Sequence, residues 1–175
     1  MGLGKWISGW LGFCMGGPLG AFAGFALGWL LEKSMSGQDE ADYTQQERER
    51  MQYEGQRNSF LFSLLSLASY IIRADGRVMH SEMELVRRFL RQNFGEMAVS
   101  EGEKIMMRLF EYQKQMGMPQ FAGNIHDVCG QIADNMEYSQ RLQLLNFLVS
   151  IAQADGVVVS EEIAALHNVA LWMGI

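Results

Sequence analysis

The chain has 175 residues, 49% of them hydrophobic, and a formal net charge of −6 from 14 Lys and Arg against 20 Asp and Glu. This length and apolar content suit one well-packed domain and argue against a disordered chain or a second large domain. The acidic balance argues against a nucleic-acid partner, because neutralising phosphates needs a basic face.

The first predicted element is an apolar segment without a charged residue, from Trp6 to Leu31. As a helix with a rise of about 1.5 Å per residue it is long enough to cross the roughly 30 Å of a bilayer's hydrocarbon core. Trp10 stands near one end and Trp29 near the other, as is typical of membrane interfaces. We predict one transmembrane helix, with residues 1–33 as a membrane anchor.

Two other interpretations of this segment stay open. A cleaved signal peptide would have a shorter apolar core and a small-residue cleavage site. A buried hairpin would form if Gly16-Gly17-Pro18 broke the helix, although a kink leaves fewer backbone groups unpaired in lipid. Lys33, Arg48 and Arg50 mildly favour a cytoplasmic location for the part of the chain that follows a single pass.

Glycine recurs at every fourth position of the segment. Small residues at this spacing lie on one helix face and let two backbones approach closely in lipid. We therefore predict self-association into a homodimer through this face; the alternative is a Gly-rich segment without a specific partner. The packing face consists of Gly12, Gly16, Gly20, Gly24 and Gly28.

Residues 34–56 form an acidic, charged connector, and residues 57–175 form the packed domain. Apolar positions at helical spacing and only two prolines predict an all-α bundle of six to seven helices. The expected ranges are 57–73, 81–94, about 101–116, 119–135, 140–154 and 161–172. The expected signals at their N-termini are Ser81 with Glu84, Ser100 with Glu103, Pro119, Ser139 and Ser160.

A short phrase occurs twice, about eighty residues apart. The run from Ala74 to Glu82 shares its Ala-Asp-Gly, its valine and its final glutamate with the run from Ala154 to Glu162. A fixed offset of this kind marks one structural unit used twice. We predict an internal pseudo-two-fold symmetry, with repeats around 57–95 and 139–175.

Each phrase resembles the second half of a calcium-binding helix-loop-helix loop, with an acid, a glycine and a glutamate in the expected order. The first copy has Ile71 and Arg73 where that loop needs its first oxygen ligands. In a purely structural interpretation the aspartates bond backbone N–H groups, the glycines adopt positive φ, the glutamates favour a helix start, and Val78 and Val158 fill the core. The alternative is a weak divalent-cation site shared by both loops, formed by Asp75, Glu82, Asp155 and Glu162.

The sequence shows no catalytic motif, so we predict no enzyme, no catalytic residue and no cofactor beyond that possible weak cation. His80, His126 and His167 lack metal-ligand spacing and are expected to be exposed or singly bonded. Cys14 and Cys129 do not indicate a disulfide framework. The methionines are expected to fill the core or, alternatively, to form an apolar groove for a partner; the relevant ones are Met106, Met107, Met116 and Met118.

The repeated Ala-Asp-Gly-x-Val-x-x-x-Glu phrase, at 74–82 and 154–162 in an all-helical repeat, resembles the TerB-like tellurite-resistance domain. The order of Gly-rich span, Arg-containing connector and helical domain resembles the N-terminal region of DjlA-type membrane-anchored DnaJ-like co-chaperones. The anchor resembles theirs in character at Gly4-Lys5-Trp6-Ile7, Met15-Gly16-Gly17, Leu27-Gly28 and Glu32-Lys33.

This resemblance implies an anchor in the inner membrane that can dimerise, a cytoplasmic helical domain, and a C-terminal J domain that stimulates a DnaK-type chaperone. These residues contain no His-Pro-Asp tripeptide, so a DnaK-type partner would depend on a J domain outside them. The leading hypothesis is a non-catalytic membrane-tethered interaction and sensing domain. The rival is a divalent-metal-binding stress-response sensor of the tellurite-resistance type.

Overall fold

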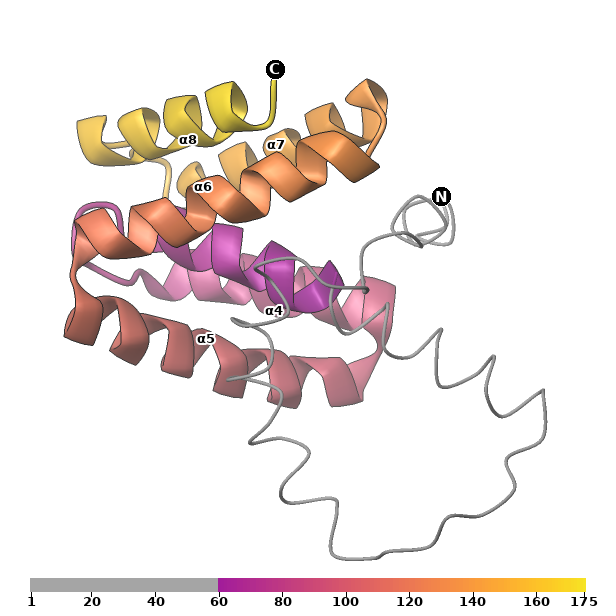
Figure 1. The fold of residues 1–175 in the computed structure, drawn as a ribbon. Helices are drawn as coiled ribbons and strands as arrows, with labels where there is room; N and C mark the ends of the chain where they lie inside the picture. Colours follow the sequence, from indigo (N-terminus) through magenta and orange to yellow (C-terminus); the bar gives the residue numbers. More distant parts are fainter. Residues whose placement is uncertain (1–59) are drawn as a thin grey trace, which may run out of the picture.

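The structure is a computed structural model that describes residues 60–175. The predicted anchor and connector, with the glycine packing face, lie outside the described residues. Within 60–175 the fold is all helical, with six helices and no strand, as predicted (Figure 1). None of these described helices is both long and apolar enough to cross a membrane. The helices are 60–72, α4 (His80–Phe94), α5 (Glu96–Met116), α6 (Met118–Asn135), α7 (Tyr138–Ala152) and α8 (Ser160–Trp172).

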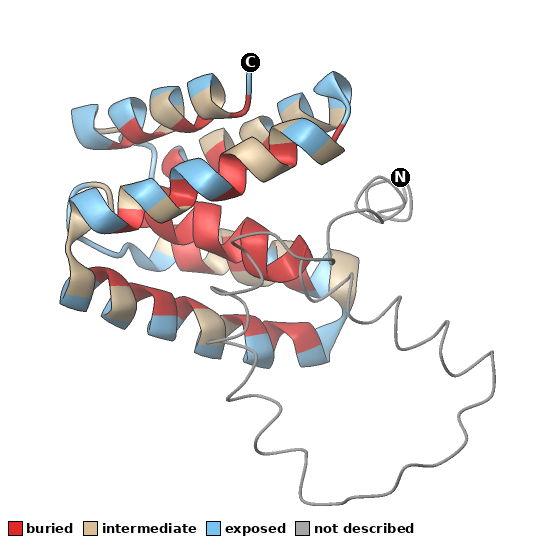
Figure 2. Ribbon diagram, in the orientation of Figure 1, coloured by how far each residue is buried: buried red, intermediate tan, exposed pale blue. Residues whose placement is uncertain are grey.

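Helix 60–72 is buried along its whole length and around its whole circumference (Figure 2). Apolar spacing alone would put Phe60, Leu64, Leu67 and Ile71 on one buried face, but the remaining residues of this helix are buried as well. Its serines are buried as well, and the hydroxyl of Ser66 donates to the carbonyl of Phe62 at 2.8 Å. Serine hydroxyls bonded within the helix in this way do not need water, so the helix can lie at the centre of the bundle.

The other helices pack around this centre in one continuous apolar core. The rings of Phe89 on α4 and Phe147 on α7 lie with centroids 4.1 Å apart. The ring centroids of Tyr70 on the central helix and Trp172 on α8 lie 6.1 Å apart. On α5, Gly102 packs against α4, and an added Cβ there would require the end of the Leu90 side chain to shift.

Several predicted helix starts were wrong because another group satisfies the first backbone N–H groups. Helix α4 begins at His80, and the residue that bonds back to its N-terminus is Glu82 rather than Glu84. Glu84 instead pairs with Arg87 at 3.3 Å. Helix α5 begins at Glu96, so the expected cap at Ser100 lies inside the helix.

At the α4–α5 junction the chain turns at a single residue, Gly95, whose φ is +89°. A glycine in this region lets the next helix begin at once. Arg91 of α4 then pairs with Glu96 of α5 at 2.7 Å across the junction. Gly95 was correctly predicted as the stop of α4, but the early start of α5 was not.

Of the remaining helix starts, that of α6 agrees with the prediction and those of α7 and α8 do not. Pro119 lies in the first turn of α6, as predicted. Helix α7 begins at Tyr138, and the side-chain oxygen of Gln140 accepts the N–H of Glu137 at 3.0 Å, so Ser139 is not the cap. Helix α8 begins at Ser160 itself, and Glu162 takes the role expected of that serine.

The two copies of the repeated phrase form turns with the same backbone pattern. Helix 60–72 and α4 are joined by residues 73–79, and α7 and α8 are joined by residues 153–159 in the same backbone pattern. The N–H of Gly76 donates to the carbonyl of Arg73 at 2.9 Å, and that of Gly156 donates to Gln153 at 3.0 Å. The two glycines have nearly equal φ values, +82° and +83°.

We expect Gly76→Val to lower the free energy of unfolding by about 1 kcal/mol or more, because a β-branched residue is strained at positive φ. An added Cβ at Gly76 would meet no atom within 4 Å, so this cost comes from the backbone alone. Gly76→Asn should lose less, since asparagine tolerates this conformation. Urea unfolding of a fragment of residues 57–175 measures the difference.

The matched control is Gly123→Ala in α6, where an added Cβ also meets nothing within 4 Å but φ is not positive. This change should leave stability unchanged or raise it by up to about 1 kcal/mol, because alanine favours the helix. Equal losses from both substitutions would show that backbone conformation at Gly76 is not the cause.

Candidate functional site

The two equivalent turns carry the acids that the sequence singled out. Asp75 accepts the N–H of Arg77 at 2.8 Å through Oδ1, and Asp155 accepts the N–H of Val157 at 3.0 Å through the same atom. Both aspartates are exposed. The predicted turn role of these aspartates is therefore confirmed.

The two glutamates lie one helical turn into α4 and α8. Glu82 accepts the N–H of Met79 at 2.8 Å, and Glu162 accepts the N–H of Val159 at 3.0 Å. These bonds satisfy backbone donors at the helix starts, where an acid is also favoured by the helix dipole. Both glutamates are nevertheless buried, which the sequence did not indicate.

Tertiary packing brings these two glutamates together. The side chains of Glu162 and Asp155 lie close enough to Glu82 to influence its pKa. The pKa of Glu82 is raised to about 7, and burial is the largest cause. The bond from the N–H of Met79 lowers the pKa, whereas Glu162 and the charge of Asp155 raise it. With its pKa raised in this way, Glu82 keeps its proton up to near neutral pH.

The four predicted cation ligands are only partly assembled. Glu82 and Glu162 meet, and Asp155 is near enough to act on Glu82 through its charge, whereas Asp75 is not among the groups that influence Glu82. Between residues 60 and 175, no three carboxylate, imidazole or thiol groups are placed to hold a metal ion. The weak cation site remains a prediction, without a preformed set of three ligands in this region.

The two valines of the repeated phrase differ in exposure. Val78 is exposed, so its predicted place in the core was wrong, whereas Val158 is partly buried against the core. Arg77, Val78 and Met79 of the first turn are all exposed, so this turn is less buried than the second. Equal sequence in the two phrases thus leads to unequal packing.

The histidines and the described cysteine provide no catalytic arrangement. His80, His126 and His167 are exposed; His126 lies 3.5 Å from Asp127 and edge-on to Trp172. Cys129 is buried and free, and burial raises the pKa of its thiol to about 12. A thiol held protonated in this way is a poor nucleophile. Cys14 lies outside the described residues.

The methionines mainly fill the core. Met106 is fully buried, and Met116 and Met118 are partly buried against the core, while Met107 is exposed. The side-chain amide of Gln113 donates to the sulfur of Met118 at 2.6 Å. The methionines that were considered as a partner groove therefore do not share one open surface.

A separate apolar hollow of about 460 Å³ lies between α4 and α7, with Leu64 of the central helix at its floor. It contains no ionisable side chain, so it offers no acid–base chemistry. Its other lining residues are Phe89, Leu142, Gln143, Leu144, Asn146 and Phe147.

Comparison with known families agrees with this architecture. Residues 62–175 match the family described as tellurite resistance protein TerB, and residues 1–46 match the co-chaperone DjlA transmembrane domain. No curated protein and no solved structure matches the chain. The two family matches follow each other in the order that the sequence resemblance indicated.

We expect the stability of the 57–175 fragment to fall as pH rises from about 4.5 to about 7. Glu82 has a folded pKa near 7 and an ordinary value of 4.5, so the folded state alone keeps its proton in this window. The stabilisation is complete below pH 4.5 and is lost as pH rises through 7, by up to about 3 kcal/mol.

Glu82→Gln should remove most of this dependence, since its amide still accepts the N–H of Met79 and donates to Glu162 without ionising. Glu101→Gln on the exposed face of α5 is the control and should leave the pH profile unchanged. Chemical unfolding from pH 4 to 8 checks both; identical profiles for Glu82→Gln and the parent would contradict the raised pKa of Glu82.

Divalent cations should bind the acidic turns only weakly, with dissociation constants on the order of 10⁻⁴ to 10⁻³ M, because hard cations such as calcium take six to eight oxygens. Calorimetric titration of the fragment with calcium, magnesium, manganese and zinc measures this. A micromolar site that Asp75→Asn combined with Asp155→Asn abolishes would show that the turns form a true metal centre.

Proposed function

Because the chain belongs to the family of tellurite resistance protein TerB, we propose that it is a non-catalytic, membrane-tethered interaction and sensing domain of the DjlA type. The observation that carries this proposal is the order of the two matches, a DjlA transmembrane domain at 1–46 followed by a TerB domain at 62–175. The first supports attachment to a membrane, and the second supports a helical domain held beside it.

In this proposal the anchor crosses the inner membrane once and the helical domain faces the cytoplasm. The anchor also pairs two copies through its glycine face. Co-chaperone activity towards a DnaK-type protein would come from a J domain outside these residues, because the His-Pro-Asp tripeptide that such a domain needs does not occur in them. The helical domain would then control that activity or recruit partners for it, rather than stimulate the ATPase itself.

The buried acid pair supports a sensing role. The pKa of Glu82 is raised to about 7, so small changes in pH or in nearby charge alter the protonation of this buried group. The same contact lends some support to the rival function, a divalent-metal sensor, because it brings two of the four predicted ligands together. That rival ranks second because the remaining ligands are not assembled with them.

Membrane attachment and orientation are tested by fusing a reporter after Ile175. We expect a fluorescent protein to be bright and alkaline phosphatase to be inactive in this position, and the fusion to stay with membranes after alkaline extraction. The control lacks residues 1–33 and should become extractable. An active phosphatase or an extractable parent would contradict the proposed topology.

Self-association should depend on the glycine face. Gly20→Leu with Gly24→Leu should reduce a membrane two-hybrid signal strongly, because bulky side chains prevent close backbone approach. Gly17→Leu with Ala21→Leu is the control, since these positions are one residue further along and point away from the face. Equal signals from the two double variants would show that the glycine register does not direct pairing.

A further inference from the structure

One end of the described domain, which we call the turn end, exposes apolar side chains beside the repeated turns. It carries Val78 and Met79 from the first turn, each 42% exposed. From the second repeat it carries Val157, 64% exposed, and Ile163, 57% exposed.

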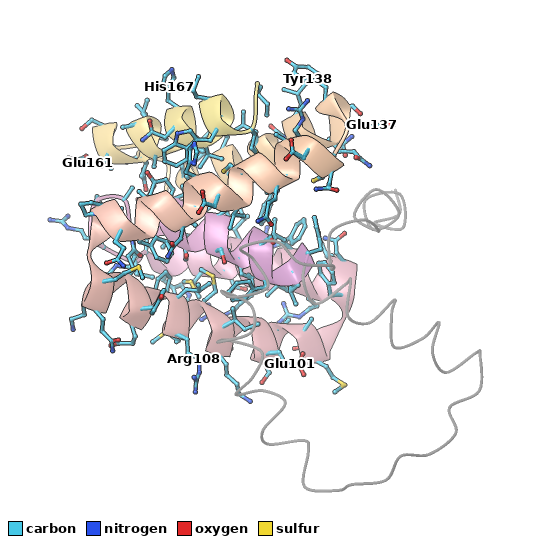
Figure 3. All side chains as sticks on the ribbon, viewed as in Figure 1. Glu101, Arg108, Glu137, Tyr138, Glu161 and His167 are labelled. Atoms are coloured by element: carbon cyan, nitrogen blue, oxygen red, sulfur yellow. The ribbon has the colours of Figure 1, made fainter. Side chains whose placement is uncertain are left out.

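These residues lie at the same end of the bundle. The contact between Glu82 and Glu162 joins the start of α4 to the start of α8, and Asp155 acts on Glu82 through its charge. Figure 1 shows the connections before α4 and before α8 at the same end of the molecule. Figure 3 shows Glu161 at that end and Glu137 and Tyr138 at the opposite end.

The internal repeat shows that the fold does not require an apolar group at the position of Val157. The position equivalent to Val157 is Arg77, which is exposed in an almost identical turn. The position equivalent to Ile163 is Met83, which is only 7% exposed because it faces the core. Val157 is apolar and exposed although the equivalent turn carries arginine, and Ile163 is exposed as well. Exposed apolar residues of this kind are typical of an interaction surface.

The charges around this surface indicate the kind of partner. Asp75, Asp155 and Glu161 are exposed at the turn end, against exposed Arg77 and His80 and the half-buried Arg73 of the first turn. Glu82 is buried at the same end, and none of the groups that influence its pKa is a cation. An anionic membrane or the turn end of a second copy would bring like charges together, whereas a basic segment would be attracted.

We propose that the turn end binds a basic amphipathic segment of a partner protein. The segment places its apolar side chains on Val78, Met79, Val157 and Ile163, and its Lys or Arg side chains on Asp75, Asp155 and Glu161. This inference rests on the proposed interaction role and names the partner's chemistry. It is the familiar mode in which an amphipathic segment lays its apolar face on an uncovered apolar surface.

The test uses the full chain in its own membranes, with the photo-crosslinking residue p-benzoylphenylalanine at Ile163. The matched control carries it at Leu171, which is 64% exposed on the same helix but near its other end. We expect a crosslink from Ile163 alone, to a peptide that mass spectrometry shows to have apolar residues at helical spacing and Lys or Arg beside them.

Two variants then test the recognition chemistry. Val157→Arg copies the residue of the first repeat, and Asp155→Asn with Glu161→Gln removes two charges while the asparagine can still accept the N–H of Val157. Each should reduce the Ile163 crosslink by about fivefold or more, as expected when an interface loses an anchor residue or its charge pairs. Leu171→Arg should leave it unchanged, and thermal unfolding confirms that each variant is folded.

The proposal is overturned by a crosslink to a second copy, to lipid alone, or to a segment without basic residues, and equally by no crosslink or by a yield that neither variant lowers. If Val157→Arg fails to fold, the charge variant decides. Membrane extraction of the same samples separates the two proposals, because a chain that stays in the membrane without the crosslink retains the proposed attachment and loses only this surface.

Discussion

The all-round burial of helix 60–72 is the constraint on which the rest of the domain depends. A helix that contacts no water must be surrounded by other helices, and its polar groups must be satisfied within it. The bonds of Ser66 and Ser69 to their own helix meet the second condition. The first condition draws the second repeat, α7 and α8, against the first, and so makes the two turns neighbours.

That neighbourhood produces the unusual electrostatics of the domain. Each glutamate by itself is an ordinary group that bonds the start of its own helix. Packing removes both from water and brings Glu162 near Glu82, and burial is the largest influence that raises the pKa of Glu82. A domain joined at such a point responds to proton concentration and to any charge that approaches the turn end, which suits a sensing role beside a membrane.

The surface of the turn end arises because the two turns share a backbone conformation but differ in the exposure of their side chains. The backbone repeats closely, yet Val78 is exposed where Val158 is partly buried, and Met83 is buried where Ile163 is exposed. Two equal turns therefore present unequal surfaces. Such divergence leaves the fold intact and frees one copy of the phrase to serve recognition while both maintain the joint.

The sequence by itself determined the helical class, the repeat, and the turn roles of Asp75 and Gly76, because these depend on local spacing and backbone conformation. It misplaced the starts of α4 and α8 by one residue, since Glu82 and Glu162 satisfy the backbone donors that Ser81 and Ser160 were expected to satisfy. Only the tertiary structure decided that these two glutamates are buried and meet. Their separation of eighty positions carries no local signal, and their contact arises only when both repeats pack around helix 60–72.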